Sequence, residues 1–172
     1  MPRPVINIAD IVLEPRPPAF APSGAAAERF EAKMGFIAPR IGARKLGYNL
    51  TAVPPGKSAF PSHNHHANEE MFFVLQGTGE LQVGGNTYPI RVGDVIACPA
   101  GGKEAAHQIV NTGAEELRYL AVSTKLSPEL VEYPHSGKFG VLAELPASDD
   151  GTPRRFMFVG RESDSRDYWE GE

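Results

Sequence analysis

The sequence predicts an all-β fold, a barrel or sandwich of short strands, on the basis of three observations. The 172 residues include 18 Gly and 16 Pro. This exceeds the roughly 12% usual in soluble proteins and favours turns over long helices. Between residues 46 and 125, short runs of β-branched and aromatic residues alternate with Gly, Pro or Asn. No part of that region has the period of an amphipathic helix.

The expected strands are short and bounded by turn-forming residues. Gly84-Gly85-Asn86 separates two of them and is typical of a hairpin turn. No internal repeat is detectable, so the strands form a single unit. They cover residues 46–53, 71–76, 80–83, 87–90, 95–98, 107–111 and 117–124.

The two segments that flank the strand region differ from it in composition and in the regularity of their sequence pattern. The chain therefore divides into an N-terminal extension (1–45), a barrel (46–125) and a C-terminal extension (126–172). In the first extension, Ser23 is a candidate cap for a short helix over 25–33, which Gly35 would end.

The C-terminal extension is less regular, with one late strand expected over 156–159. Its charged tail carries adjacent Tyr168 and Trp169, which are uncommon in a wholly disordered segment. We expect this extension to pack on the barrel or on a partner subunit.

Composition argues against several classes of protein. The net charge is −4 and no basic stripe is visible, which argues against nucleic-acid binding. The N-terminus lacks the apolar core of a signal peptide, and no stretch approaches the roughly 20 apolar residues of a membrane span. We expect a soluble cytoplasmic protein. The single cysteine, Cys98, excludes an intrachain disulfide and is interpreted as a small buried side chain.

Three histidines and one glutamate are candidate ligands for a metal ion. His63 and His65 lie two residues apart, so both would leave one face of a strand. Glu70 opens the expected strand 71–76, and His107 opens a strand much later in the chain. Imidazoles suit Fe, Zn and Ni, and a carboxylate adds affinity for harder ions such as Mn. Four such ligands would leave an octahedral ion two open positions, as in catalytic sites.

The spacing around these residues resembles the two motifs of the cupin superfamily. The first motif reads Gly56, six residues, His63-Asn64-His65, four residues, Glu70, six residues and Gly77. The spacing to Gly77 selects Glu70 over Glu69. The second motif reads Gly93-Asp94, Pro99, Gly101, then His107, three residues and Asn111. His107 stands six places after Gly101 where the family has three, which indicates a small insertion that includes Gly102, Lys103 and Glu104.

The resemblance implies a double-stranded β-helix, the cupin jelly-roll barrel, commonly dimeric, with a divalent metal (Fe, Zn, Mn or Ni) at its centre. It implies His63, His65, Glu70 and His107 as metal ligands. It says little about the reaction, because cupins include dioxygenases, isomerases, epimerases, decarboxylases, lyases, storage proteins and sugar-sensing domains. A homodimer with a small-molecule ligand or substrate is expected.

Parity along the strands suggests which residues line a substrate pocket. Phe72, Val74 and Gln76 share the parity of Glu70, and Asn111 shares that of His107. Tyr48, on the strand before the first motif, could face the same cavity. His66 has the wrong parity for a ligand, and His135 is interpreted as a surface residue.

These features favour a metal-dependent enzyme acting on a small molecule. Dioxygenase-like oxidoreductase chemistry is favoured over isomerase or hydrolase chemistry, because three His and one Glu accept Fe(II) well. The alternative is a non-catalytic module that binds a small carbohydrate or carboxylate. The sequence identifies no catalytic acid or base.

Overall fold

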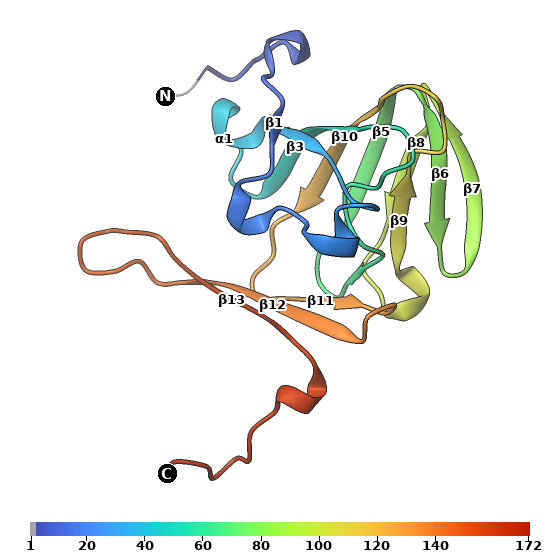
Figure 1. Cartoon of the computed structure of the whole chain (residues 1–172). Helices are drawn as coiled ribbons and strands as arrows, with labels where there is room; N and C mark the ends of the chain where they lie inside the picture. Colours follow the sequence, from blue (N-terminus) through green and yellow to red (C-terminus); the bar gives the residue numbers. More distant parts are fainter. Residues whose placement is uncertain (1–2) are drawn as a thin grey trace.

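A computed structural model describes residues 3–172 and shows a mostly β protein (Figure 1). Short 3-10 helices cover Ile8–Asp10, Pro18–Phe20, Gly24–Ala26, Lys103–Ala105 and Glu162–Asp164, and helix α1 covers Ala38–Ile41. The strands are β1 (Glu14–Pro15), β2 (Lys33–Phe36), β3 (Leu46–Val53), β4 (Asn64–His65), β5 (Glu70–Gln76), β6 (Thr78–Val83), β7 (Asn86–Arg91), β8 (Val95–Cys98), β9 (His107–Val110), β10 (Leu117–Thr124), β11 (Glu129–Tyr133), β12 (Lys138–Leu145) and β13 (Arg154–Gly160).

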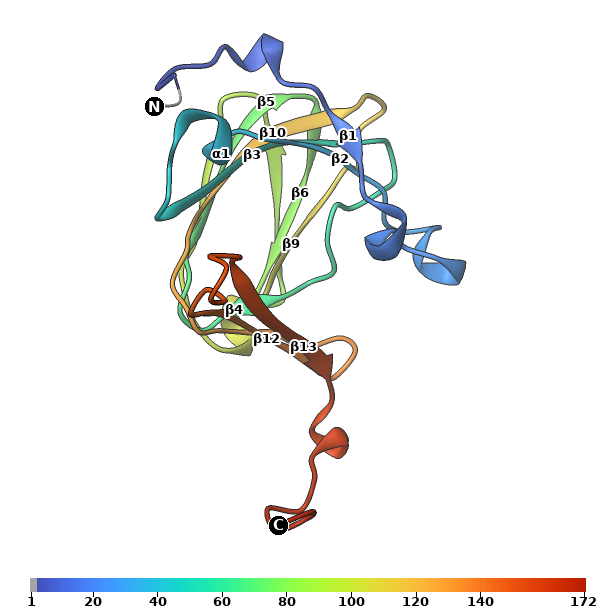
Figure 2. The same ribbon diagram turned by 90° about the vertical axis from the view of Figure 1, so that its left-hand side faces the viewer.

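Three antiparallel sheets build the molecule. The largest has the strand order β1-β2-β3-β10-β5-β8, and a three-stranded sheet has the order β7-β6-β9. A third sheet, β13-β12-β11-β4, lies across one end of the barrel (Figures 1 and 2). Short antiparallel strands joined by glycine-containing turns produce this arrangement, and the hairpin of β6 and β7 closes at Val83 opposite Asn86.

The two barrel sheets pack face to face around one apolar core. Val53, Val74 and Leu117 are fully buried, and Leu81 and Ile109 enter the core from the opposite sheet. Along β5 the buried positions alternate, so Phe72 and Val74 face this core.

The N-terminal extension covers part of the outer face of the largest sheet. Ile11 and Ile37 pack there against Leu50 in a second apolar cluster. Beyond this cover, Met71 and Phe73 on the outer face of β5 stay 48% and 40% exposed. The extension thus shields only part of a strand that is apolar on both faces.

The predicted helix over 25–33 is wrong. The chain forms only a 3-10 turn at Gly24–Ala26, and the side chain of Ser23 makes no capping hydrogen bond. Gly35 does not end a helix but lies within β2, where an added Cβ would stand 2.2 Å from Cγ2 of Ile11 and 2.8 Å from the carbonyl oxygen of Val12. A parallel bridge between Phe30 and Ser58, followed by the pairing of β2 with β3, holds this segment extended and overrides local helix propensity.

The C-terminal extension supplies more strand than expected. Besides the predicted strand, which lies within β13, it contributes β11 and β12, and β11 pairs with β4 at the barrel. The tail after Gly160 runs away from the barrel (Figures 1 and 2), and Tyr168 and Trp169 are 83% and 72% exposed. Packing of this tail on a partner subunit stays a prediction. In residues 3–172, every helix is too short or too polar to cross a membrane.

Truncation of Leu117 should reveal how much the barrel core contributes to stability. We expect Leu117→Ala to lower the free energy of unfolding by about 2–5 kcal/mol, because it opens a cavity at a fully buried site. Leu126→Ala makes the same chemical change at a side chain that is 58% exposed and should cost far less. Urea denaturation measures both values, and equal losses would contradict this assignment of the core.

Candidate metal centre

His63 and His107 are held side by side by the backbone. They form an isolated antiparallel bridge, in which the amide of His63 donates to the carbonyl of His107 at 3.1 Å and the amide of His107 donates back at 2.8 Å. Their rings are 4.7 Å apart between centroids. The Lys103–Ala105 turn lies in the predicted insertion, directly before the chain enters β9 at His107.

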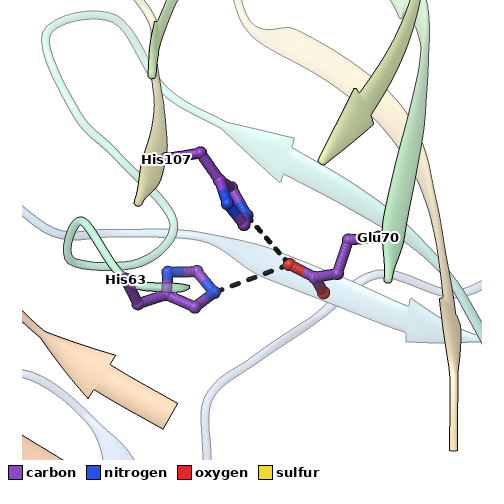
Figure 3. Close-up of side chains that lie close together, drawn as sticks. All are labelled: His63, Glu70 and His107. Atoms are coloured by element: carbon purple, nitrogen blue, oxygen red, sulfur yellow. Dashed lines mark hydrogen bonds and ion pairs between the residues drawn. The ribbon is translucent and has the colours of Figure 1, made fainter. Parts of the chain in front are cut away.

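Glu70 opens β5 and directs its carboxylate toward both imidazoles (Figure 3). Its Oε2 atom lies 3.0 Å from Nε2 of His107 and 3.5 Å from Nε2 of His63. One ligand atom from each of these three residues lies within 4.8 Å of the others. Donors bound to one ion at about 2.0–2.2 Å must stand this close together.

His65 lies beside this group of three. Its Nε2 atom is 3.5 Å from Oε2 of Glu70, and its ring centroid is 5.0 Å from that of His63 and 6.4 Å from that of His107. Both ring nitrogens of His65 are buried without a hydrogen-bond partner in the described chain. Buried polar atoms that lack a partner are costly, so this ring has a reason to take a ligand.

The donor set therefore fits a divalent metal. The structure brings His63, Glu70 and His107 together, with His65 in contact with the carboxylate and carrying free nitrogens. Imidazole and carboxylate are donors that Fe, Zn, Mn and Ni accept.

The electrostatics favour a charged Glu70. Burial alone would raise its pKa, but the hydrogen bond from His107 and the close approach of the His63 and His65 imidazoles hold the pKa of this carboxyl well below its usual range. Burial acts to lower the pKa of His65, yet the Glu70 and Glu129 carboxylates outweigh it and the pKa of His65 is raised. The site thus offers an ionised oxygen among three imidazoles.

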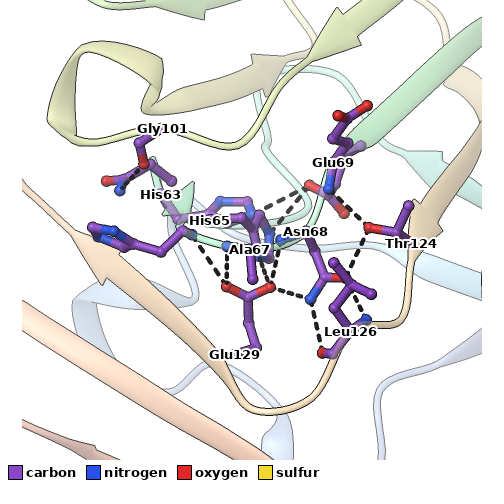
Figure 4. A network of polar contacts seen from close by, with 12 residues as sticks. His63, His65, Ala67, Asn68, Glu69, Gly101, Thr124, Leu126 and Glu129 are labelled. Atoms are coloured by element: carbon purple, nitrogen blue, oxygen red, sulfur yellow. Dashed lines mark hydrogen bonds and ion pairs between the residues drawn. The ribbon is translucent and has the colours of Figure 1, made fainter.

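A second carboxylate, Glu129 on β11, holds the loop that carries His65 (Figure 4). Its Oε1 accepts from the amides of His66 and Ala67 at 3.1 and 3.2 Å, and its Oε2 accepts from the amide of Asn68 at 2.9 Å and from the Asn68 side chain. Oε2 also lies 3.7 Å from Nδ1 of His65. The C-terminal extension thus fixes the loop between the second histidine and Glu70.

Sequence reasoning missed Glu129 because the strand inverts the usual pattern. Along β11 the side chains of Glu129 and Val131 are buried, whereas Leu130 is 37% exposed. A buried carboxylate next to an exposed leucine contradicts the ordinary burial preference of both residue types. The buried amides that need an acceptor are visible only in three dimensions.

Histidines outside the ligand set lie where the sequence indicated. His66 points away from the centre, with Nε2 2.9 Å from Oε2 of Glu132, and His135 is exposed. Glu69 is exposed. Cys98 is 3% exposed within the core, and burial raises the pKa of its thiol to about 12, so it is no nucleophile at neutral pH.

The predicted pocket residues divide into two groups. Phe72 lines a small inner pocket with Glu70 and His107, and Val74 is part of the barrel core. Tyr48 is wrong as a pocket residue, because it packs in the second apolar cluster on the outer face of the sheet. Gln76 is also wrong, because it is exposed at the far end of β5, six residues beyond Glu70.

Asn111 has a structural role instead of a place in the pocket. It is fully buried, and its side chain donates to the carbonyls of Val53 and Glu115 at 2.8 Å each and accepts from the amide of Gly113 at 3.0 Å. Both of its N–H donors and its oxygen are thus engaged by backbone groups. It therefore orders the turn after β9.

Two hollows adjoin the cluster. The inner pocket, about 20 Å³, is bounded by Phe72, Ile109 and Tyr119. An outer cavity of about 230 Å³ lies between the barrel and the third sheet, and both His65 and Glu70 line it. A small molecule therefore has room to approach the carboxylate from the side of the C-terminal extension.

Comparison with known proteins agrees with this geometry. The sequence profile of the Cupin domain family matches residues 49–123, which contain all four candidate ligands. Residues 49–123 are thus a cupin domain. An oxalate-binding protein of Thermotoga maritima is 37% identical to this cupin over 70 residues, which are 41% of this chain and 54% of that protein. The match thus spans about half the length of that relative.

Solved cupin structures resemble the fold. A putative sugar phosphate isomerase from Acidithiobacillus ferrooxidans superposes with a TM-score of 0.65 and 29% identity, covering 79% of this chain and 80% of that one. A sugar phosphate isomerase of the cupin superfamily from Silicibacter pomeroyi has a TM-score of 0.75, 21% identity, and coverage of 97% and 98%. At this low sequence identity, the similarity to the Silicibacter pomeroyi structure supports a shared fold and nothing more.

Removal of the Glu129 charge should loosen the ligand loop. We expect Glu129→Gln to lower the free energy of unfolding by about 2–4 kcal/mol, because one amide oxygen cannot accept every N–H that now meets the carboxylate. Glu144→Gln, at a side chain that is 62% exposed, is the matched control. Hydrogen exchange at the amides of residues 66–68 should accelerate only in the first variant; unchanged exchange there would contradict the clamp.

Proposed function

We propose that this cupin is a metal-dependent enzyme acting on a small molecule, with His63, His65, Glu70 and His107 as the metal ligands. The observation that carries the proposal is the convergence of three imidazole nitrogens on one ionised carboxylate oxygen, at 3.0, 3.5 and 3.5 Å, beside a cavity. A divalent ion bound there would supply Lewis-acid or redox chemistry.

The residues of the chain itself prepare the site for that chemistry. Glu70 contributes the negative charge, and Phe72 and Tyr119, packed edge to face with centroids 5.6 Å apart, bound its inner side with aromatic surface. On the outer side, His65 and Glu70 line a cavity that a small substrate can enter. The centre is thus bounded by aromatic surface at a pocket of about 20 Å³ and adjoins a larger cavity of about 230 Å³.

Among the possible chemistries we favour a dioxygenase-like oxidoreductase. Imidazoles with one carboxylate and open positions are the donor set of non-haem Fe(II) oxygenases. The alternative is a non-catalytic module for a small carbohydrate or carboxylate, which the similarity to a protein named for oxalate binding favours. Isomerase or hydrolase chemistry with Zn or Mn is a further outcome that the experiments below separate.

Loss of one ligand should reduce metal affinity. We expect His107→Ala to weaken binding of Fe(II), Mn(II) or Zn(II) by at least the roughly 10–100-fold that loss of an outer partner of a metal ligand costs. His66→Ala removes a neighbouring histidine that faces Glu132 and serves as the matched control. Elemental analysis of the purified chain and competition with a chelating dye measure both. A wild-type chain that holds no metal, or equal affinities in the two variants, would contradict the proposed ligands.

The oxygenase hypothesis predicts an iron centre with a free position for a diatomic ligand. We expect the anaerobic Fe(II)-loaded chain to bind nitric oxide, a stand-in for dioxygen, and to give the EPR signal of a high-spin iron–nitrosyl. Glu70→Gln, which removes the charged oxygen donor, should diminish the signal. A chain that retains zinc, shows no nitrosyl signal and binds oxalate without turnover would instead indicate the binding module.

A further inference from the structure

A basic cleft lies on another side of the ligand cluster, and neither the metal nor the family match accounts for it. It has a volume of about 400 Å³ and forms where the N-terminal extension meets the loop before His63 and the turn between β11 and β12. Arg16, Arg29, His135 and Lys138 are among its lining residues. We call this site the basic cleft.

No ion pair within the described residues neutralises the three Arg and Lys side chains of the basic cleft. Its lining contains no Asp or Glu. In residues 3–172, Arg16, Arg29 and Lys138 take part in none of the ion pairs that join other basic and acidic side chains. The chain as a whole carries a net charge of −4, so this concentration of cations is a local feature and does not reflect overall composition.

Arg16 is the central cation. Its guanidinium lies 4.4 Å from the ring centroid of Phe60, and Nη2 donates to the carbonyl of Ala59. Burial acts to lower the pKa of Arg16 and no carboxylate offsets it, so the charge is desolvated without an ion-pair partner. A guanidinium has five N–H donors, and these contacts occupy one of them. The others can bind an oxyanion in bidentate fashion.

Aromatic and apolar side chains form the rest of the basic cleft. Phe20, Phe30, Phe60 and Tyr133 line it, and the ammonium of Lys138 lies 5.8 Å from the ring centroid of Tyr133. Rings flanking a cluster of cations suit a molecule with one anionic end and one apolar body. A hydrated inorganic ion would use the charges but leave these rings without a contact.

The basic cleft adjoins the candidate metal centre. Phe60 and Pro61 line both the cleft and the inner pocket of the cluster. The ring of His63 lies 6.2 Å from that of Phe60 and 6.3 Å from that of Tyr133. A ligand in the cleft would therefore sit one side chain away from His63.

We propose that the basic cleft binds the carboxylate or phosphate group of a small organic anion, with Arg16 as the main contact and the aromatic rings against its apolar part. Binding requires the cations of the cleft and does not require the metal. The proposal therefore goes beyond the metal centre and can fail or hold independently of it.

The test is an NMR titration of the full ¹⁵N-labelled chain with four probes. Phenyl phosphate and benzoate combine an oxyanion with a ring, inorganic phosphate lacks the ring, and benzyl alcohol lacks the charge. We expect the first two to give saturable shifts at the amides of Phe60, Ser62 and His63 and of Tyr133 and residues 135–138. Inorganic phosphate should bind more weakly, and benzyl alcohol most weakly. The shifts should persist after chelation and dialysis.

Variants connect the shifts to the cations. Arg16→Gln should weaken phenyl phosphate binding by about tenfold or more, since it removes a charged hydrogen-bond donor. Lys138→Gln changes an exposed side chain, so it keeps the test valid if the first variant does not fold, and it should weaken binding severalfold. Arg91→Gln, at an exposed position on β7 away from the cleft, is the matched control and should change affinity less than about twofold.

Four results would overturn the proposal. Shifts that vanish on metal removal would assign the anion to the metal, and shifts centred on Lys125 and Arg155 would assign it to the outer cavity. Cleft amides that already shift when residues 166–172 are deleted, with no anion added, would identify the acidic, aromatic tail as the occupant. Affinity unchanged in both Arg16→Gln and Lys138→Gln would equally exclude the cleft.

Discussion

The candidate metal centre depends on one largely buried carboxylate, that of Glu70, which is surrounded by imidazoles. Taking the charge of Glu70 out of water is costly unless hydrogen bonds replace its hydration. His107, only 4% exposed in its side chain, provides one such bond at 3.0 Å, and the imidazoles of His63 and His65 lie 3.5 Å from the same oxygen. Their convergence requires a particular backbone, in which the His63–His107 bridge and the start of β5 meet at one end of the barrel. The apolar core beneath holds these segments in place, because Phe72 and Val74 continue the same face of β5.

A second carboxylate, that of Glu129, stabilises the loop next to the candidate metal centre. In the loop from His66 to Asn68, Glu129 accepts from the amides of Ala67 and Asn68 and shares the amide of His66 with the carbonyl of Leu130. Asn68 extends the network, since its Oδ1 accepts from the amide of Leu126 at 2.7 Å and from the hydroxyl of Thr124 at 2.8 Å. The third sheet is thereby joined to the ligand loop by polar contacts and not only by the pairing of β4 with β11. Loosening of the third sheet would therefore disturb His65 before it disturbs the barrel core.

The sequence predicts the barrel well because its signals are local there. The expected strands at 46–53, 95–98 and 117–124 coincide with β3, β8 and β10, and motif spacing identifies the cluster formed by His63, Glu70 and His107. Predictions fail where tertiary packing overrides local preference. Tyr48 lies on the outer face because Val53 on the same strand takes the inner one, and the segment expected as a helix yields to β2 packing. Glu129 escapes prediction because a buried glutamate beside an exposed leucine has no pattern to mark it.

The family match and the extensions carry different information about function. Residues 49–123 contain the candidate ligands, whereas the outer cavity and the basic cleft draw much of their lining from residues outside that range, including Glu129 and Arg155 in one and Arg16 and Lys138 in the other. A relative that aligns only over the barrel need not share these walls. Similarity thus bears on the segment that holds the candidate ligands, whereas the extensions of this chain build much of the two cavity walls. The charge of the residues that line these two cavities therefore indicates the kind of ligand better than the name of any relative does.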